Sequence, residues 1–334
     1  MSRRQMPFWA NPPTPPRLPD GQGRTGAGRA GIARNAPADN QPVAFTVCCE
    51  PLRPEIRRPN TADLNRIFAD DKPRLLMNNS LRQFTNILFL DIETVSGVPL
   101  YEQLDERLQH LWSKKANQYR KNGTETDAEL FRQRGGILAE FGKIVSVALG
   151  YLVEKQGRYV LTISSLAADD ERALLEKFND YVRRFDLHIN RANGEFAGRR
   201  SVQLCAHNGR EFDFPYLARR ILINRLALPA VLQTQGKKPW EVTHIDTMDL
   251  WKFGDFKNYT SLDLLAAVFN IPSSKEEMDG SLVHTVYYDE HDLEKIARYC
   301  ALDVVNAAQV LLALNGHDIL PPENIEPTRI EIVA

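Results

Sequence analysis

The feature that most constrains the fold of this chain is an apolar run that leads into two acids, Asn86-Ile-Leu-Phe-Leu-Asp-Ile-Glu-Thr-Val-Ser-Gly97. Its first part, from Ile87 to Leu90, is too short for a helix and is typical of a strand buried on both faces. Residues i and i+2 of a strand share a face, so Asp91 and Glu93 are expected to point the same way at the end of this strand. Two like charges so close are unfavourable unless a cation lies between them, and Mg²⁺ and Mn²⁺ take oxygen ligands of this kind. An exposed Asp-x-Glu at a strand end is the alternative that this segment alone leaves open.

Composition places the chain among soluble globular proteins and excludes several classes of function. The chain has 334 residues, of which 43% are apolar and 25% charged, and we find no apolar run near the roughly 20 residues of a membrane span. The formal net charge of −1 includes an Arg-rich start, so the remainder is acidic, which argues against a protein that coats long duplexes. Four cysteines without a Cys-x-x-Cys spacing predict neither a disulfide framework nor a zinc site. We therefore expect reduced thiols and a cytoplasmic protein.

Residues 1–76 are expected to form a disordered tail. This part is rich in Pro, Gly and Arg, and its first 60 residues hold more than half of the chain's 20 prolines. The segment Gly26-Ala-Gly-Arg-Ala-Gly31 fits the dinucleotide fingerprint, but no predicted strand precedes it and no helical pattern follows, so no dinucleotide cofactor is expected. An organelle transit peptide and a natural start at Met77 remain open interpretations.

The rest of the chain is expected to form one α/β domain over residues 77–318, followed by a C-terminal tail over 319–334. The patterns predict a strand, a helical insertion, a two-stranded hairpin, and then alternating strands and helices. The segment from His244 to Trp251 is predicted as a strand that runs into a loop, and the last helix runs from about His291 to Asn315. This order predicts a mixed sheet with helices on both faces.

The second acidic segment lies where a predicted strand turns into a helix. The strand ends at His207-Asn208, Gly209 allows a turn, and the helix begins near Asp213. Ligands usually bind at such turns in α/β sheets, and the Asn208 amide and the Phe212 ring could hold a nucleotide. An Asp at a helix start is also a common N-cap, which is the alternative here.

The third acidic segment, Tyr299-Cys-Ala-Leu-Asp303, lies inside the last predicted helix. Positions i and i+4 share a helical face, so Tyr299 and Asp303 are expected together at the margin of the buried side. A partly buried Tyr beside a surface Asp is the alternative. Asp246 and Asp249, which follow a later strand, are interpreted as bystanders, and His207 as a residue bonded locally in its turn.

In this order, the three segments resemble the motifs of the DEDD superfamily of 3′–5′ exonucleases. Asp91 and Glu93 match the first motif, Asp213 the second and Asp303 the third. The spacing Tyr-x-x-x-Asp marks the tyrosine (DEDDy) branch of that superfamily. Over about residues 86–314 the chain looks like the stand-alone predicted exonucleases related to the exonuclease domain of family-B DNA polymerases.

The resemblance implies a ribonuclease-H-like fold, with a central five-stranded mixed sheet flanked by helices, and a hydrolase that uses two divalent cations, Mg²⁺ or Mn²⁺. Asp91 would bridge both ions, and Tyr299 would orient the attacking water. The residues expected to hold the ions are Asp91, Glu93, Asp213 and Asp303, and those expected to contact the substrate are Thr94, Asn208 and Phe212.

Single-stranded DNA is the favoured substrate, with nucleoside 5′-monophosphates as products. An RNA 3′–5′ exonuclease and a catalytically silent nucleic-acid-binding protein are the alternatives, and the intact acidic and Tyr positions favour an enzyme. No membrane partner is expected. Because no polymerase segment is recognised, proofreading or repair would need a replication or repair protein in trans.

Overall fold

The computed structural model describes residues 81–121, 123–192, 201–255, 259–274 and 278–334. These residues belong to one unit of the chain, Asp70–Ala334. The expected tail over residues 1–76 lies outside the described residues, so its conformation stays a prediction.

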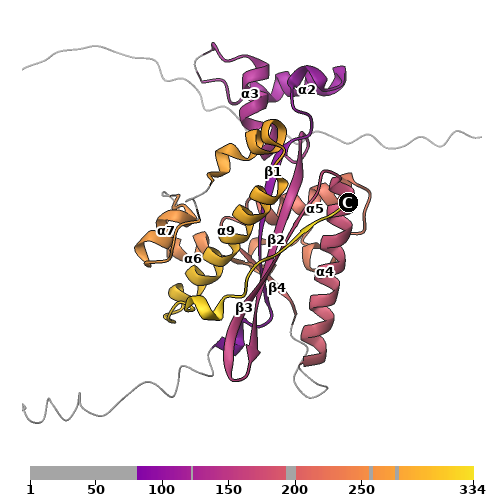
Figure 1. The fold of residues 1–334 in the computed structure, drawn as a ribbon. Coiled ribbons are helices and arrows are strands. Elements are labelled where there is room, and N and C mark those ends of the chain that lie inside the picture. Colours follow the sequence, from indigo (N-terminus) through magenta and orange to yellow (C-terminus); the bar gives the residue numbers. More distant parts are fainter. Residues whose placement is uncertain (1–80, 122, 193–200, 256–258, 275–277) are drawn as a thin grey trace, which may run out of the picture. The chain divides into compact units, whose positions relative to one another are not determined.

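A six-stranded mixed sheet forms the centre of the fold (Figure 1). Its strands are β1 (Ile87–Ser96), β2 (Gly142–Lys155), β3 (Arg158–Ala167), β4 (Gln203–Ala206), β5 (Ile245–Asp246) and β6 (Arg329–Ile332). The spatial order is β5-β4-β1-β2-β3-β6. β1, β2 and β3 are antiparallel neighbours, whereas β4, β5 and β6 each join the sheet in parallel. The predicted α/β architecture and the β2–β3 hairpin are thereby confirmed.

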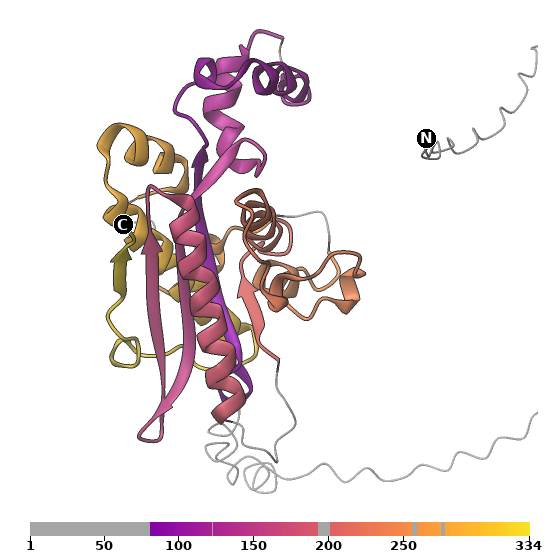
Figure 2. The same cartoon turned by 90° about the vertical axis from the view of Figure 1, so that its right-hand side faces the viewer.

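Helices cover both faces of the sheet, with α4 and α5 on one face and α9 on the other (Figures 1 and 2). The helices are α2 (Glu106–Ala116), α3 (Asp127–Arg134), α4 (Glu171–Ala192), α5 (Asp213–Ile223), α6 (Thr247–Lys252), α7 (Leu262–Val268), α8 (Val283–Thr285) and α9 (Leu293–Leu314). A π-helical turn, Val286–Glu290, follows α8. Short 3₁₀ turns lie at Leu81–Phe84, Tyr101–Gln103, Gly135–Ile137, Ala230–Leu232, Pro239–Glu241, Gly280–Leu282 and Pro322–Asn324.

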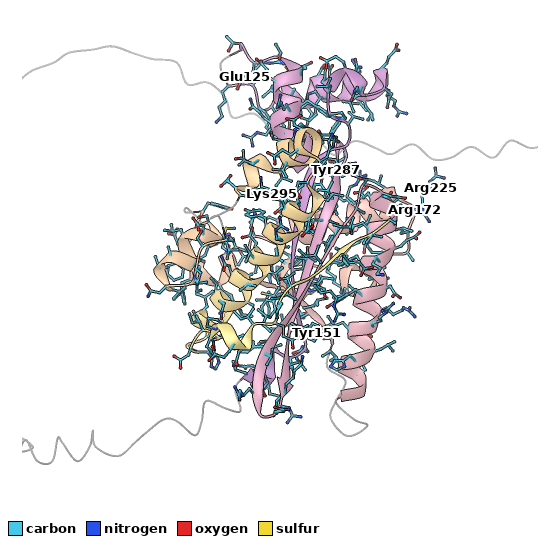
Figure 3. All side chains as sticks on the ribbon, viewed as in Figure 1. Glu125, Tyr151, Arg172, Arg225, Tyr287 and Lys295 are labelled. Carbon is cyan, nitrogen blue, oxygen red and sulfur yellow. The ribbon has the colours of Figure 1, made fainter. Side chains whose placement is uncertain are left out.

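Strand β1 contributes to the apolar packing on both faces, because successive side chains of a strand point in opposite directions. Leu88 and Leu90 pack with residues of α4 and α5, whereas Phe89 packs with Val304 of α9. Figure 3 shows side chains filling the space on both sides of the sheet. The same alternation continues into Asp91 and Glu93, which therefore face α9.

Helix α9 is long and apolar enough to cross a membrane by length and composition alone. However, 72% of its most apolar window is buried inside the fold. Its hydropathy is therefore that of a helix packed in a core, on the sheet face where the acids of β1 lie.

The C-terminal residues differ from expectation. Residues 319–334 were expected to be a tail, but β6 pairs with β3 from Ser164↔Arg329 to Ala167↔Ile332. This pairing gives the sheet six strands instead of five. Leu320 is also buried in the core beside α9. The domain therefore extends beyond residue 318, where it was expected to end.

Two strand boundaries also differ from expectation. Strand β1 does not end near Asp91 but continues to Ser96, with a register shift against β2 between Glu93 and Thr94. The strand expected within 244–251 is only two residues long, because the Asp246 carboxylate accepts hydrogen bonds from Met248 and Asp249 and caps α6.

Candidate active site

Strand β1 places the first two acids beside the start of α5. Its parallel pairing with β4 ends at Phe89↔Cys205, upstream of Asp91. Beyond that point Asp213, the first residue of α5, accepts a hydrogen bond from the backbone N–H of Ile92. The first and second acidic segments are thus joined by a direct hydrogen bond. This bond lies on the part of the β1 edge that does not pair with β4.

The turn from β4 into α5 is held by Asp246 of β5. The Asp246 carboxylate accepts hydrogen bonds from the backbone N–H groups of Asn208 and Arg210, both at 3.0 Å. Asn208 adopts a left-handed φ of 62°, which Asn tolerates better than most residues. Gly209 is required here, because a Cβ at this position would lie 2.5 Å from the Cβ of Ala206. Asp246 was interpreted as a bystander, but it positions the turn that carries Asn208 and Asp213.

His207 was expected to bond locally in its turn, and this prediction is wrong. Its Nδ1 lies 2.9 Å from Thr247 Oγ1 and its Nε2 2.8 Å from the carbonyl oxygen of Thr260, which are 40 and 53 positions further along the chain. Asp249 lies at the surface, 2.9 Å from Lys252 Nζ and 3.8 Å from the Arg210 guanidinium. Neither residue reaches the other acids in the hydrogen bonds described.

Helix α9 brings the third segment to the same place. Tyr299 is buried, and its hydroxyl bonds to the Asp303 carboxylate one turn later. Ser274 Oγ donates a hydrogen bond of 2.6 Å to Asp303 Oδ1. Cys300 Sγ donates to the backbone carbonyl of Asp91 at 3.3 Å, which joins α9 to β1. The four acids therefore converge from β1, α5 and α9.

The electrostatics confirm that these acids lie close together. Burial, and then the charges of Asp303, Glu93 and Asp213, hold the pKa of Asp91 well above its usual range. Burial, and then Asp303, Asp213 and Asp279, raise the pKa of Glu93 in the same way. Burial raises the pKa of Asp213 to about 7, although its hydrogen bonds from backbone N–H groups oppose the shift. Each carboxylate is thus costly to ionise without a neighbouring cation.

The donor set fits a hard divalent cation. Among the described residues no Lys, Arg or His forms an ion pair with Asp91, Glu93 or Asp213. The ligand atoms of Asp91, Glu93 and Cys300 lie within 4.8 Å of one another. Burial and the charge of Asp91 raise the pKa of the Cys300 thiol, so this sulfur stays protonated and the oxygens remain as ligands. Oxygen ligands suit Mg²⁺ or Mn²⁺ better than zinc.

Tyr299 keeps its proton at neutral pH and can act as a hydrogen-bond donor or acceptor. Burial, followed by the charges of Asp303, Glu93 and Asp91, raises the pKa of its hydroxyl far above the usual value. A proton that is held so firmly cannot be given up to make a base. The hydroxyl can orient a polar group beside the carboxylates.

A cleft of about 530 Å³ opens beside Glu93, which is within the size range of small-ligand sites. Thr94 and Phe212 line it with Glu93, and α3 contributes Arg132 to its wall. Asn208 does not belong to this lining, and its Oδ1 is buried without a hydrogen-bond partner among the described residues. Two of the three expected substrate contacts therefore share one cleft with Glu93.

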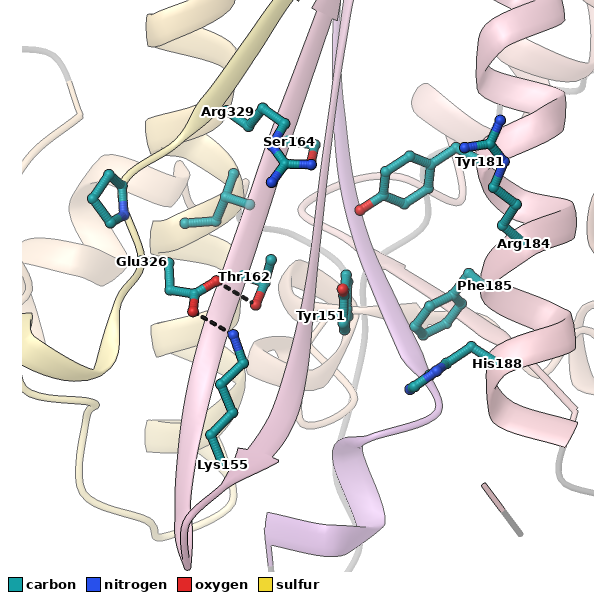
Figure 4. A pocket seen from close by; sticks show the side chains of 12 residues that line it. Tyr151, Lys155, Thr162, Ser164, Tyr181, Arg184, Phe185, His188, Glu326 and Arg329 are labelled. Carbon is teal, nitrogen blue, oxygen red and sulfur yellow. Dashed lines mark hydrogen bonds and ion pairs between the residues drawn. The ribbon is translucent and has the colours of Figure 1, made fainter. Parts of the chain in front are cut away.

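A second hollow, of about 450 Å³, lies where α4, β3 and the C-terminal segment meet (Figure 4). Its lining includes one carboxylate, Glu326, which is bound to Lys155 and accepts a hydrogen bond of 2.9 Å from Thr162 Oγ1. Glu326 is a single carboxylate that is already bound to Lys155, so this hollow does not offer the set of acids that a divalent cation needs. This hollow therefore does not match the group of acids around Asp91.

Sequence reasoning brought the right acids together but missed the residues that hold them. Ser274 bonds to Asp303 from a loop 29 positions away, and Asp246 bonds to Asn208 across 38 positions. Neither residue has a local pattern that predicts such a contact. Only the parallel pairing of β4 with β5, had it been predicted, would have pointed to Asp246.

Comparison with known protein families gives a match. A family model described as a predicted 3′–5′ exonuclease related to the exonuclease domain of PolB matches residues 137–317. The matched region contains Asp213, Tyr299 and Asp303, whereas Asp91 and Glu93 precede it. A search of curated proteins returns no match to the chain. The mixed sheet flanked by helices agrees with the ribonuclease-H-like fold expected for such an enzyme.

Proposed function

Because this chain belongs to the family of predicted 3′–5′ exonucleases related to the exonuclease domain of PolB, we propose that it removes nucleotides from the 3′ ends of single-stranded DNA. Nucleoside 5′-monophosphates would be the products. The observation that carries this proposal is the convergence of four acids from β1, α5 and α9 beside a cleft of about 530 Å³.

Two divalent cations, Mg²⁺ or Mn²⁺, would be held by Asp91, Glu93, Asp213 and Asp303. Asp91 is the best candidate for a shared ligand, since its pKa is raised by each of the other three acids. When bound, the cations would supply the Lewis acidity that activates a water and neutralises charge on the phosphodiester.

The chain's own residues would position the substrate. Thr94 and Phe212, which line the cleft with Glu93, would hold the terminal nucleotide, with the Phe212 ring available to a base. Asn208, placed by its backbone bond to Asp246, would offer its unpartnered Oδ1 as an acceptor. The protonated Tyr299 hydroxyl would orient the attacking water by a hydrogen bond.

The test incubates the purified full chain with 5′-labelled DNA and RNA strands, with Mn²⁺ or with chelator. We expect the DNA strand to shorten stepwise from its 3′ end, with release of 5′-monophosphates and no reaction in chelator. Faster degradation of the RNA strand would mean that RNA is the substrate, since the 2′-hydroxyl is the group that distinguishes ribose from deoxyribose. A folded protein that degrades neither strand at any Mn²⁺ concentration would exclude the nuclease function.

A second arm of this experiment examines strand pairing. Unpairing a duplex end costs a few kcal/mol, so blunt DNA should react more slowly than single strands or mismatched ends. Equal rates on blunt duplex and single-stranded DNA would contradict a site that accepts one unpaired strand.

A further inference from the structure

The C-terminal end of α6 and the residues that follow it carry exposed aromatic rings. The exposed fractions of Phe253 and Tyr259 are 86% and 69%. Trp251, in the last turn of α6, is 37% exposed, and its ring packs edge to face against Phe269 at 5.9 Å. We call these three residues the aromatic cluster. Single exposed apolar side chains are normal on a protein surface, but three rings within nine positions need an explanation.

The backbone at Phe253 supports a role outside folding. Phe253 adopts φ 43° and ψ 33°, a left-handed conformation that bulky residues avoid because Cβ approaches a carbonyl oxygen. Its ring gains little burial to offset that cost. For folding alone, glycine would be the better residue here, as Gly254 with φ 88° illustrates next to it. Strain without a packing gain is a feature of residues kept for binding.

Hydrogen bonds of His207 tie two described parts of this region to the turn that leads to Asp213. His207 bonds to Thr247 at the start of α6 and to the carbonyl oxygen of Thr260, which follows Tyr259. The next residue after His207 is Asn208, on that turn. The start of α6 and Thr260 are therefore held beside the turn that carries Asn208.

The aromatic cluster does not belong to the cleft beside Glu93. The cleft is lined from β1, α3 and residues 280–285, and none of the three rings belongs to it. Figure 1 shows α6 and α7 beside α9, whereas α3 lies near the far end of β1. If the cleft holds the terminal nucleotide, as proposed above, the strand that leads to it can pass on the side of the cluster.

We propose that the aromatic cluster is a stacking site for the part of the substrate strand that lies on the 5′ side of the scissile bond. This inference rests on the proposed function. Exposed rings stack on bases of any sequence, since every base has a π-face. Lys252 lies between two of the rings, but its ammonium group is hydrogen-bonded to Asp249 at 2.9 Å. The contact is therefore expected to depend more on stacking than on charge, and to change little with salt.

The test measures binding of fluorescein-labelled oligothymidylates of two, four and eight nucleotides by anisotropy. The full chain carries Asp91→Asn, so that the strand is not consumed. With the rings intact, affinity should increase with strand length. Phe253→Gly combined with Tyr259→Ala should weaken binding of the eight-nucleotide strand by roughly tenfold or more, and the length dependence should be lost.

Matched variants separate stacking from damage to the fold. Glycine adopts the backbone conformation of position 253 without strain, so the melting temperature of Phe253→Gly should not fall. Phe253→Trp keeps a ring and should keep the affinity. Leu264→Ser changes an exposed aliphatic residue of α7 and should leave strand binding unchanged.

Two results would overturn the stacking site. One is an unchanged affinity for eight nucleotides in the Phe253→Gly, Tyr259→Ala protein. The other is unchanged strand binding together with a shift from dimer to monomer in sedimentation, which would assign the rings to contact with a second copy. The two proposals also fail separately. If strand binding depends on the rings but the protein has no nuclease activity, only the nuclease function is refuted. If the protein is an active nuclease but strand binding does not depend on the rings, only the stacking site is refuted.

Discussion

Acids at two places in this fold, Glu171 and the half-buried pair Asp91 and Glu93, have opposite surroundings. Glu171, at the start of α4, accepts hydrogen bonds from the backbone N–H of Ile144 and from Nε of Arg220, both at 2.8 Å. Asp91 and Glu93 have no such cation among the described residues, and further acids raise their pKa values. A buried acid with its own arginine serves the fold, whereas an acid surrounded by acids needs a cation from outside.

Helix α5 connects the two groups. Arg220, near its C-terminal end, donates to Glu171 of α4 and, at 2.8 Å, to the carbonyl oxygen of Ala139. Asp213 is the first residue of the same helix. The ion pair therefore fixes the helix that presents an acid to the candidate site, and the two kinds of acid are parts of one arrangement.

The largest effect is expected from Asp91→Ala, which removes the carboxylate that interacts with all three other acids. Nuclease activity should fall to background, and added Mn²⁺ should restore little of it. Rates on a labelled single strand, measured over a range of Mn²⁺ concentrations, check this prediction. Near-normal activity would mean that the acids of β1 do not serve catalysis.

Asp91→Asn serves as the control for folding in that experiment. It keeps the shape of the side chain and removes one of several charges that repel each other. The metal-free variant should therefore unfold at the same urea concentration as the wild-type protein or at a higher one. A lower midpoint would place Asp91 among the acids that stabilise the fold, and would break the comparison with Glu171.

The opposite result is expected for Glu171→Ala. Only 12% of the Arg220 side chain is exposed, so the variant leaves a buried guanidinium without its carboxylate. Breaking a buried pair in this way costs about 3–5 kcal/mol of unfolding free energy, measurable by urea denaturation. Glu171→Leu combined with Arg220→Met should recover most of the loss, since neither charge then remains. A small effect of the single change would show that water replaces the partner.

The clustered acids of the candidate site were predictable because they lie in strong local patterns. Asp91 follows a buried strand, and Asp303 lies one turn after Tyr299 on an apolar helix. Each of those patterns involves only a few neighbouring residues. The confirmed part of the fold, the sheet with helices on both faces, follows from the same local signals.

The missed features depend on pairings between distant residues. Strand β6 is a four-residue segment that forms by joining the edge of β3, more than 160 positions earlier. The end of β1 is decided by its register with β2, where Ser96 pairs with Gly142. Such contacts leave no local period, which is why the sequence predicted five strands and an early end of β1.

A smaller catalytic effect is expected from Tyr299→Phe, which removes one hydroxyl and keeps the ring packed in its buried position. Losing one positioned hydrogen bond in the transition state should lower kcat roughly a hundredfold. Calorimetric Mn²⁺ titrations should be unchanged, because the carboxylates remain. Tyr299 would then differ from Asp91 in affecting the rate alone. Loss of Mn²⁺ binding in this variant would contradict the separation of roles.

The comparison extends to a buried base, for which the smallest effect is expected. His244 is 5% exposed, with Nε2 at 2.9 Å from the Val231 carbonyl oxygen, and burial lowers its pKa to about 4. Above the unfolded pKa of about 6.5, the imidazole is neutral in both states and its stabilising effect is complete. As the pH falls below that value, the unfolded chain takes up the proton first, and roughly 2 kcal/mol of unfolding free energy should be lost by pH 5.

Urea denaturation checks this prediction. The unfolding free energy of His244→Gln should fall less between pH 7 and pH 5 than that of the wild-type protein. Changing the exposed His110 to Gln serves as the control and should leave the wild-type decrease unchanged. An equal pH dependence in wild-type and His244→Gln proteins would mean that other groups, such as the acids of the site, govern stability in this range.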